Sequence, residues 1–583
     1  MYLRSHIKRK GGESYHYWTL VESIRTERGP RQRIVATLGK LPGLDKEERV
    51  GWKEIGRVLS GEPEHSSDLF EPEDDIPHWA TVDVKGVKVE RVRRFGDVFL
   101  ALAVWKRLHL DAIFHDLPLQ GREEIGWDVT VCILALARLC EPSSELAIAE
   151  RWYEKTALDE LLGVAKEKIN DDRLYRTLDQ VLPYRDAVCR ALQDRYAEWF
   201  GTSFDFLLYD VTSVYFEGLA KGNPQAKRGY SRDHRPDCAQ VCIGLVVTME
   251  GLPVAYEVFD GNRPDVTTLE DIVEVMESKY GKARRVWVFD RGVVSEDSLE
   301  ELRKRKAQYV VGTPKEMLKQ FEAELTERGW EKVRPGVEVK IVNNPAYGRE
   351  TFILCRSRER EAKEQAMLKQ QGRRLEAKLV AIQSSIRKGK LNKPSAVERR
   401  IGRWMGRYTR AEKLFDVELL VKDERVIDMV IKRRKENEDW AKLSHGAYLL
   451  RTNLKEEDPG TLWKIYIQLN QAERAFRLTK SDLGIRPIFH QKEHRVQAHI
   501  FICFLALAMW KSLELWMESK GLGSCARRLI EEFKEIRSMD VVLPVRDRNP
   551  VRLRVVAKPE DHVQVLLHKL GLKIPNRPKM VKM

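Results

Sequence analysis

The stretch FDFLLYDVTSVYFEG, residues Phe204–Gly218, decides how the rest of this chain is interpreted. Its content of Phe, Leu, Tyr and Val predicts a β-strand, and Asp210 lies in the middle of it. Burying a carboxylate costs free energy unless the group is paired or binds a metal. Asp210 therefore marks a candidate functional site, and the elements that follow indicate its kind.

The residues after this stretch predict an alternating order of strands and helices. Apolar runs predict the strands, and apolar residues at helical spacing predict the helices. In chain order these are the strands QVCIGLVVTM (240–249) and LPVAYEVF (252–259), the helix TTLEDIVEVMESK (267–279), the strand RRVWVFD (284–290), the helix SEDSLEELRKRK (295–306) and the strand QYVVGT (308–313). A hairpin therefore comes first, and helical crossovers follow.

Asp290 ends the strand that follows the first of these helices. In an RNase H-like fold this strand is a neighbour of the one that carries Asp210, which would bring the two carboxylates to one site. Adjacent carboxylates repel each other, and a divalent cation with oxygen ligands, typically Mg²⁺, resolves the repulsion. Two ions ~3.5–4 Å apart could hold the attacking and leaving oxygens of a phosphodiester. A third carboxylate is then expected on a later helix.

Glu473 is the candidate for the third carboxylate. Tyr466, Leu469, Arg477 and Lys480 stand at offsets of −7, −4, +4 and +7 from it, which places all five on one stripe of a predicted helix. The stripe presents a phenol, a carboxylate and two cations, a combination that suits a phosphate backbone beside a metal. The alternative is a solvated charged face with ordinary i,i+4 pairs, and the stripe alone favours that alternative.

Length and charge restrict the possible functions. A chain of 583 residues is expected to form two to four domains. The formal net charge of +14 favours a polyanionic partner, most often nucleic acid, and a merely soluble basic protein is the alternative.

The eight cysteines form no CxxC pair, so we expect no zinc motif. Scattered cysteines of this kind are typical of a protein in a reducing cytosol. The apolar run 498–510 is too short to span a bilayer and predicts a buried core helix.

Three blocks resemble the DDE triad of insertion-sequence transposases: Asp210 in YDVT, Asp290 in FDRG, and Glu473 in the 466–480 segment. The third block is similar to the Y-x2-R-x3-E-x6-K signature of one such group, although Leu469 stands where the signature has Arg. The flanking GYSRDHRPD, FDGNRPD and GIRPIFHQKEHRVQAHIFICFLAL, and the N-terminal YHYWTLVESIR and RQRIVATLGKL, also look like this group.

The resemblance implies a fold and a set of site residues. The fold would be α/β, with an RNase H-like mixed-sheet catalytic core, a large α/β insertion in it, and an N-terminal β segment and helical domain before it. Asp210, Asp290 and Glu473 would be the catalytic residues. They would bind two Mg²⁺ ions, which Mn²⁺ can replace. The residues expected to contact DNA are Tyr466, Arg477, Lys480 and Arg291, with Arg477 supplying the cation that the signature places at 469.

The implied function is a DNA transposase. It would bind the terminal inverted repeats of its insertion sequence, pair two ends as a homodimer in a synaptic complex, cut them and join the freed 3′-hydroxyls to target DNA. No nucleotide cofactor and no membrane would take part, and the cytoplasm of a bacterium or archaeon, at the nucleoid, is the expected location. The alternatives are an RNase H-like structure-selective nuclease without strand transfer, and a DNA-binding protein that has lost activity. A complete Asp/Asp/Glu set argues against the second alternative.

The expected domains follow from the residue composition of each stretch and from the spacing of its apolar residues. They are an N-terminal β segment with an acidic linker (1–78), a helical DNA-binding domain (79–203), the first part of the core (204–312), the insertion (313–455), the second part of the core (456–520) and a C-terminal region (521–583). Residues 356–413 carry 18 Lys or Arg against 6 Glu, which predicts sequence-independent contacts with the DNA backbone. His490, His494 and His499 lie near one another in sequence but match no zinc motif, so zinc is set aside.

Overall fold

The computed structural model describes residues 2–10, 13–26, 29–39, 80–118, 124–280, 285–343, 347–348, 350–455, 458–546, 549–575 and 578–581. The acidic linker expected at residues 60–78 lies outside these ranges. The chain divides into two compact units. Unit 1 consists of Met1–Arg285 and Asn470–Met583, and unit 2 of Val286–Leu469. The division falls between residues 285 and 286, inside the expected first part of the core, so the domain boundaries drawn from the sequence stay predictions.

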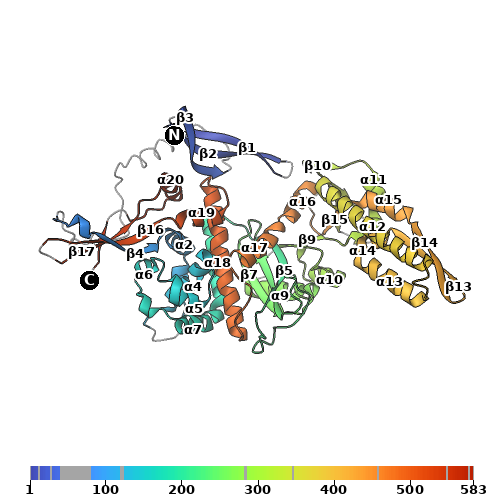
Figure 1. Ribbon diagram of the computed structural model, residues 1–583, viewed down its shortest axis with the longest axis horizontal. Coiled ribbons are helices and arrows are strands. Elements are labelled where there is room, and N and C mark those ends of the chain that lie inside the picture. Colours follow the sequence, from blue (N-terminus) through green and yellow to red (C-terminus); the bar gives the residue numbers. More distant parts are fainter. Residues whose placement is uncertain are drawn as a thin grey trace. The chain divides into compact units, whose positions relative to one another are not determined.

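One long helix, α18 (Glu493–Ser519), forms the centre of the helical part of unit 1 (Figure 1). The helices α2 (Gly96–Arg107), α4 (Trp127–Cys140) and α7 (Asp171–Val181) pack against it. The other helices of this part are α3 (Leu110–His115), α5 (Glu145–Ala147), α6 (Leu158–Leu162), α8 (Arg185–Phe200), α19 (Ala526–Phe533) and α20 (Asp561–Leu570). α18 is long and apolar enough to cross a membrane, but its most apolar window is 94% buried inside the protein. This confirms the expected core helix, because a helix that is apolar all round must be covered on all sides.

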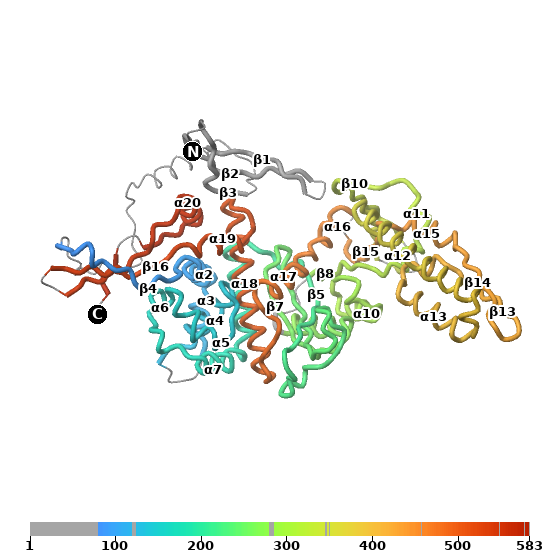
Figure 2. The backbone as a smooth tube through the Cα atoms, viewed as in Figure 1, coloured from blue at the N-terminus to red at the C-terminus, as the bar shows by residue number. Residues whose placement is uncertain are grey.

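Two sheets of unit 1 come from the ends of the chain. The first is antiparallel, with the order β1 (Tyr2–Lys10), β2 (Glu13–Thr26) and β3 (Gly29–Gly39). The second has the order β18 (Lys579–Met580), β17 (Val551–Val556), β16 (Arg537–Leu543) and β4 (Lys88–Arg94). Figure 2 shows β4 beside β16, although more than 440 residues separate them in sequence. The C-terminal region is therefore attached to the start of the helical domain.

The candidate strand with Asp210 opens an antiparallel meander in unit 1. β5 (Phe206–Tyr215) pairs with β6 (Gln240–Val247), which pairs with β7 (Pro253–Asp260). β6 is buried over its whole length, as its continuous apolar run predicts. The helix α9 (Leu269–Tyr280) follows, and α17 (Asn470–Ser481) packs against β5 and β6.

Unit 2 contains a six-stranded mixed sheet. β8 (Val286–Phe289) and β9 (Gln308–Gly312) are parallel and are connected through α10 (Glu296–Lys304). The sheet continues from β9 in the antiparallel order β15 (Ala447–Thr452), β12 (Thr351–Ser357), β11 (Val337–Val342) and β10 (Glu331–Arg334). The chain order β5, β6, β7, α9, β8, α10, β9 is the RNase H-like order expected from the sequence, and the α/β fold class is confirmed.

The residues between β12 and β15 form a helical layer with its own core. α12 (Arg358–Arg387) packs against α13 (Pro394–Arg407), α14 (Thr409–Glu412) and the hairpin of β13 (Phe415–Lys422) and β14 (Arg425–Arg433), as Figure 1 shows. Four apolar residues of α12 are buried in this core: Leu375, Leu379, Ile382 and Ile386. The remaining helices of unit 2 are α11 (Glu322–Thr326), α15 (Lys435–Ser444) and α16 (Pro459–Ile467).

The single helix expected to carry Tyr466 through Lys480 is wrong, because the chain forms two helices there. α16 ends at Ile467 and α17 begins at Asn470. Between them the N–H of Leu469 donates to the carbonyl of Tyr466 at 3.0 Å, a tight i to i+3 bond. The break buries Leu469 to 7% exposure, which is worth about 2 kcal/mol. Helical offsets hold only within one helix, so Tyr466 and Leu469 do not share a stripe with Glu473.

Candidate active site

Asp210 lies half-buried on β5, the first strand of the meander in unit 1. It pairs with Leu245 of β6 in the sheet register. One carboxylate oxygen, Oδ1, accepts the backbone N–H of Val211 at 2.8 Å. The residues before it, Leu207 to Tyr209, are fully buried, so the strand holds the Asp210 backbone in a rigid apolar layer.

Glu473 lies in the first turn of α17, and its side chain is exposed. The N-terminal turn of a helix stabilises a carboxylate through the helix dipole. Because α17 packs against β5, the elements that carry Asp210 and Glu473 are in contact within unit 1. Arg477, one turn after Glu473, is also exposed, and no ion pair joins the two within the described part of the chain. The ordinary i,i+4 pair is therefore not formed.

Asp290 follows β8 directly in unit 2 and is half-buried. Its Oδ1 accepts the phenol hydroxyl of Tyr466 at 3.2 Å. Tyr466 comes from α16, which packs against β8 and β9. Burial, together with the charge of Asp290, raises the pKa of Tyr466, so the phenol stays protonated and donates.

Gly312 makes room for this contact at the end of β9. A Cβ at Gly312 would lie 2.5 Å from the hydroxyl oxygen of Tyr466, so one of the two would have to move. Glycine at this position therefore lets the phenol reach Asp290 without displacement. The contact of Tyr466 with DNA phosphate that the signature implies stays a prediction; within unit 2 its hydroxyl donates to a candidate catalytic carboxylate.

Lys480 lies on α17 and is engaged inside unit 1. Its Nζ is 2.8 Å from Oδ1 of Asp233, a side chain only 4% exposed, and Arg486 also pairs with this carboxylate. Burial lowers the pKa of Lys480, and Asp233 offsets part of that effect. The predicted phosphate contact of Lys480 would require this pair to rearrange. Sequence reasoning missed Asp233, whose only signal was an acidic residue among the cations of SRDHRPD.

Arg291, the fourth residue expected at the DNA, is exposed and follows Asp290 directly. It lines a pocket of about 210 Å³ in unit 2. Three cations line this pocket together with Asp290 and two tyrosines: Arg291, Lys315, Arg360, Tyr448 and Tyr466. Lys315 gave no signal in the sequence, because it belongs to no motif, and Arg360 was marked only as one of the 18 cations of residues 356–413.

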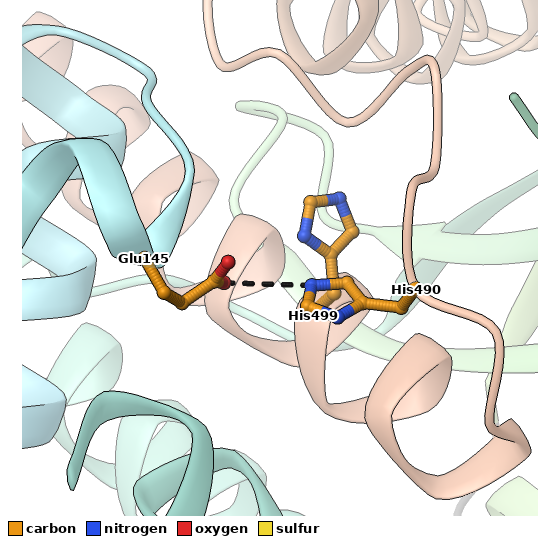
Figure 3. A group of neighbouring side chains, drawn as sticks. All are labelled: Glu145, His490 and His499. Atoms are coloured by element: carbon orange, nitrogen blue, oxygen red, sulfur yellow. Dashed lines mark ion pairs between the residues drawn. The ribbon is translucent and has the colours of Figure 1, made fainter. Parts of the chain in front are cut away.

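A buried polar cluster contains two of the three histidines that the sequence singled out (Figure 3). Nε2 of His490 lies 3.4 Å from Oε1 of Glu145, and ligand atoms of Glu145, His490 and His499 lie within 4.8 Å of one another. However, Nε2 of His499 contacts the carbonyl of Ile485 at 3.2 Å, and Nδ1 lies 3.5 Å from a guanidinium nitrogen of Arg138.

The charge of Arg138 argues against a metal in this cluster. Arg138 and Glu145 already balance each other, so a divalent cation would add two uncompensated charges to a buried site, which is strongly unfavourable. We assign no metal to it. His494 is not part of the cluster, because its Nε2 pairs with Oδ1 of Asp179 at 3.1 Å on the surface.

We expect His499 to make unit 1 sensitive to acid. Burial, then the charges of Arg138 and His490, lower the pKa of His499 from its ordinary 6.5 to about 3. Below pH 6.5 His499 is therefore protonated in the unfolded chain but stays neutral in the folded chain, and the free energy of unfolding falls. Between pH 7.5 and 5 the loss should reach ~2 kcal/mol, measured by urea unfolding.

His499→Gln, which cannot take up a proton, should remove most of this pH dependence. His494→Gln serves as the matched control, since His494 lies on the same helix, α18, but is 52% exposed. Equal pH dependence in all three proteins would show that His499 is not the titrating group.

Comparison with known proteins supports one family. The family model for the transposase DDE domain matches residues 202–509, more than half of the chain. The N-terminal domain of IS1634 family transposases matches residues 3–73, and a domain of unknown function matches residues 91–187. No curated protein matches the chain.

One solved structure that the comparison found is a cryo-EM structure of a piggyBac transposase synaptic complex with hairpin DNA. It is 9% identical and has a TM-score of 0.34, with 75% of this chain and 79% of that chain covered. The matched DDE domain contains Asp210, Asp290 and Glu473 together with the strands and helices that carry them. The chain belongs to the DDE transposases of insertion sequences, enzymes that cut DNA and transfer its strands with the help of a divalent metal.

Proposed function

We propose that Asp210, Asp290 and Glu473 are the catalytic carboxylates of this transposase and that they bind two Mg²⁺ ions, which Mn²⁺ can replace. The observation that carries the proposal is the position of all three inside the matched DDE domain. The donor set fits the metal, because hard cations prefer carboxylate oxygens. Glu473 is exposed, and Asp290 keeps Oδ2 for a ligand while Oδ1 accepts from Tyr466.

The residues around the carboxylates would orient them for phosphodiester chemistry. When bound, the metal supplies Lewis-acid activation for the attack of water, and then of the freed 3′-hydroxyl, on a phosphodiester. Tyr466 holds the Asp290 carboxylate through its hydroxyl, and the Val211 N–H does the same for Asp210. These fixed donors keep two of the three ligands in place before DNA binds, which reduces the reorganisation needed for catalysis.

We further propose that the protein binds the terminal inverted repeats of its own insertion sequence and acts as a homodimer that pairs two ends. The net charge of +14 favours DNA, and the basic residues 356–413 on α12, α13 and α14 would contact its backbone. The helical domain at 79–203 would take part in DNA binding. The place of action would be the cytoplasm of a bacterium or archaeon, at the nucleoid. A structure-selective nuclease is not favoured, because both transposase family models match.

The function is tested with the DNA that flanks the gene. Purified protein, Mg²⁺ and duplexes carrying both flanks should give cleavage at imperfect inverted repeats and covalent joining of the 3′ ends to a target plasmid. Sequencing the junctions should show short duplications of target DNA. Cleavage of branched DNA without any joined product would instead indicate the nuclease.

Arg477 is expected to bind the phosphate that the missing signature arginine would bind. It is exposed one turn after Glu473 on α17, and a guanidinium binds phosphate through two nitrogens. Arg477→Ala should lower end cleavage or strand transfer by about 30-fold, because the loss of one charged hydrogen bond costs ~2 kcal/mol, and the melting temperature should not change. Arg528→Ala is the control, since Arg528 is exposed and pairs with Glu532. Normal cleavage and joining by Arg477→Ala would contradict this role.

A further inference from the structure

The pocket beside Asp290 in unit 2 has the features of an anion site. Its volume is about 210 Å³, below the range usual for sites that enclose whole small molecules. The cations Arg291, Lys315 and Arg360 line it, against the single carboxylate of Asp290 among the residues around it. A pocket of this size and charge suits one phosphate group.

A carboxylate behind the pocket holds two of these cations in position. Nζ of Lys315 lies 2.6 Å from Oε2 of Glu364, and Nε of Arg360 lies 3.1 Å from Oε1 of the same group. The N–H of Gly446 also donates to Oε2 at 3.1 Å. Burial raises the pKa of Glu364, but the hydrogen bonds from Lys315 and Arg360 outweigh it and leave that pKa below its ordinary value. Glu364 therefore stays ionised and orients both cations.

The cations keep donors for a ligand. Arg360 uses Nε for Glu364, and its terminal Nη groups have no hydrogen-bond partner among the residues that the structure describes. The guanidinium carbon lies 4.8 Å from the ring centre of Tyr448, and Trp463 donates to the hydroxyl of that tyrosine at 2.6 Å. The side chains of Lys315 and Arg360 are 35% and 41% exposed. Both therefore reach solvent while Glu364 fixes their positions.

We propose that this pocket binds one phosphate of the DNA strand that enters the active site, with Lys315 and Arg360 donating to its non-bridging oxygens and Glu364 positioning both. The inference rests on the proposed function, because the pocket shares Asp290 with the proposed metal site. A phosphodiester has one negative charge, which matches the excess charge of Lys315 and Arg360 over Glu364. The fork of an arginine and the point charge of a lysine are the usual pair for such a group.

The test pairs protein variants with a charge deletion in the DNA. Wild type and the double variant Lys315→Gln/Arg360→Gln are titrated, over a salt series, with flank duplexes that carry one neutral methylphosphonate at successive positions. In wild type, one position should weaken binding about tenfold. In the double variant that position should have no further effect, and the slope of log K against log salt should fall by ~0.9, the value for one phosphate.

Controls separate this result from misfolding and from failure of the proposed function. Arg434→Gln removes an exposed cation of unit 2 that lies outside residues 356–413 and pairs with Asp416, and this variant should leave the coupling intact. Lys315→Arg/Arg360→Lys should restore much of the affinity. Because the readout is binding without metal, it does not depend on whether Asp290 is catalytic, and Asp290→Asn should keep the coupling.

Two outcomes would overturn the inference. If no methylphosphonate position is coupled to the double variant while inorganic phosphate raises the melting temperature of wild type alone, the pocket is a small-anion site and does not bind DNA. If neither effect occurs, Lys315 and Arg360 serve only to pair with Glu364.

Discussion

Asp210→Ala, Asp290→Ala and Glu473→Ala should each lower DNA end cleavage by on the order of a thousandfold or more, while binding of the ends changes little. The physical reason is that two oxygen-liganded cations need all three carboxylates to stabilise charge as it develops on the phosphodiester. None of the three is buried in the apolar core, so their removal should not unfold the chain. Cleavage and gel-shift assays in Mg²⁺, on the same protein preparations, measure both effects.

Matched carboxylates provide the controls for this prediction. Asp205 is exposed and precedes β5, and Asp297 is exposed on α10 shortly after Asp290. Asp205→Asn and Asp297→Asn should cleave normally. Near-normal cleavage by any one of the three alanine variants would remove that residue from the site, whereas loss of cleavage in Asp205→Asn would indicate that strand β5 had been assigned the wrong ligand.

Tyr466→Phe should reduce cleavage by roughly 10- to 150-fold without changing DNA affinity. The change removes the hydroxyl that donates to Oδ1 of Asp290, and a hydrogen bond to a charged group is worth about 1.5–3 kcal/mol. Asp290 would then turn more freely, and fewer molecules would hold it in the productive orientation. The signature-based interpretation, a direct contact with phosphate, predicts weaker binding and a smaller salt slope. Single-turnover cleavage and a salt titration of binding distinguish the two.

Tyr309→Phe is the control for this variant. Tyr309 also donates its hydroxyl to a carboxylate, that of Glu350, within unit 2, but Glu350 is not a candidate ligand. Loss of the Tyr309 hydroxyl should affect the stability of the fold and leave cleavage per folded molecule unchanged. If Tyr466→Phe cleaves at the wild-type rate, the hydroxyl does not position Asp290 for catalysis.

Local periodicity was enough to predict much of the fold. The alternating strands and helices from Phe204 to Thr313 and the core helix α18 each depend on which faces of a single element are apolar. Residues close together in sequence form these patterns, and the structure confirms them. The candidate carboxylates could be named for the same reason, because each sits inside or beside a short recognisable block.

The sequence by itself thus determined the order of elements, the family and the residues proposed for the metal. Only the tertiary structure decided what those residues touch. Tyr466 donates to Asp290 across 176 residues, and Lys480 pairs with Asp233 across 247. The break that separates Leu469 from Glu473 depends on burial, which no helical offset encodes. Long-range partners are selected by packing and by the need to satisfy buried polar groups, and these requirements exist only once distant segments have come together.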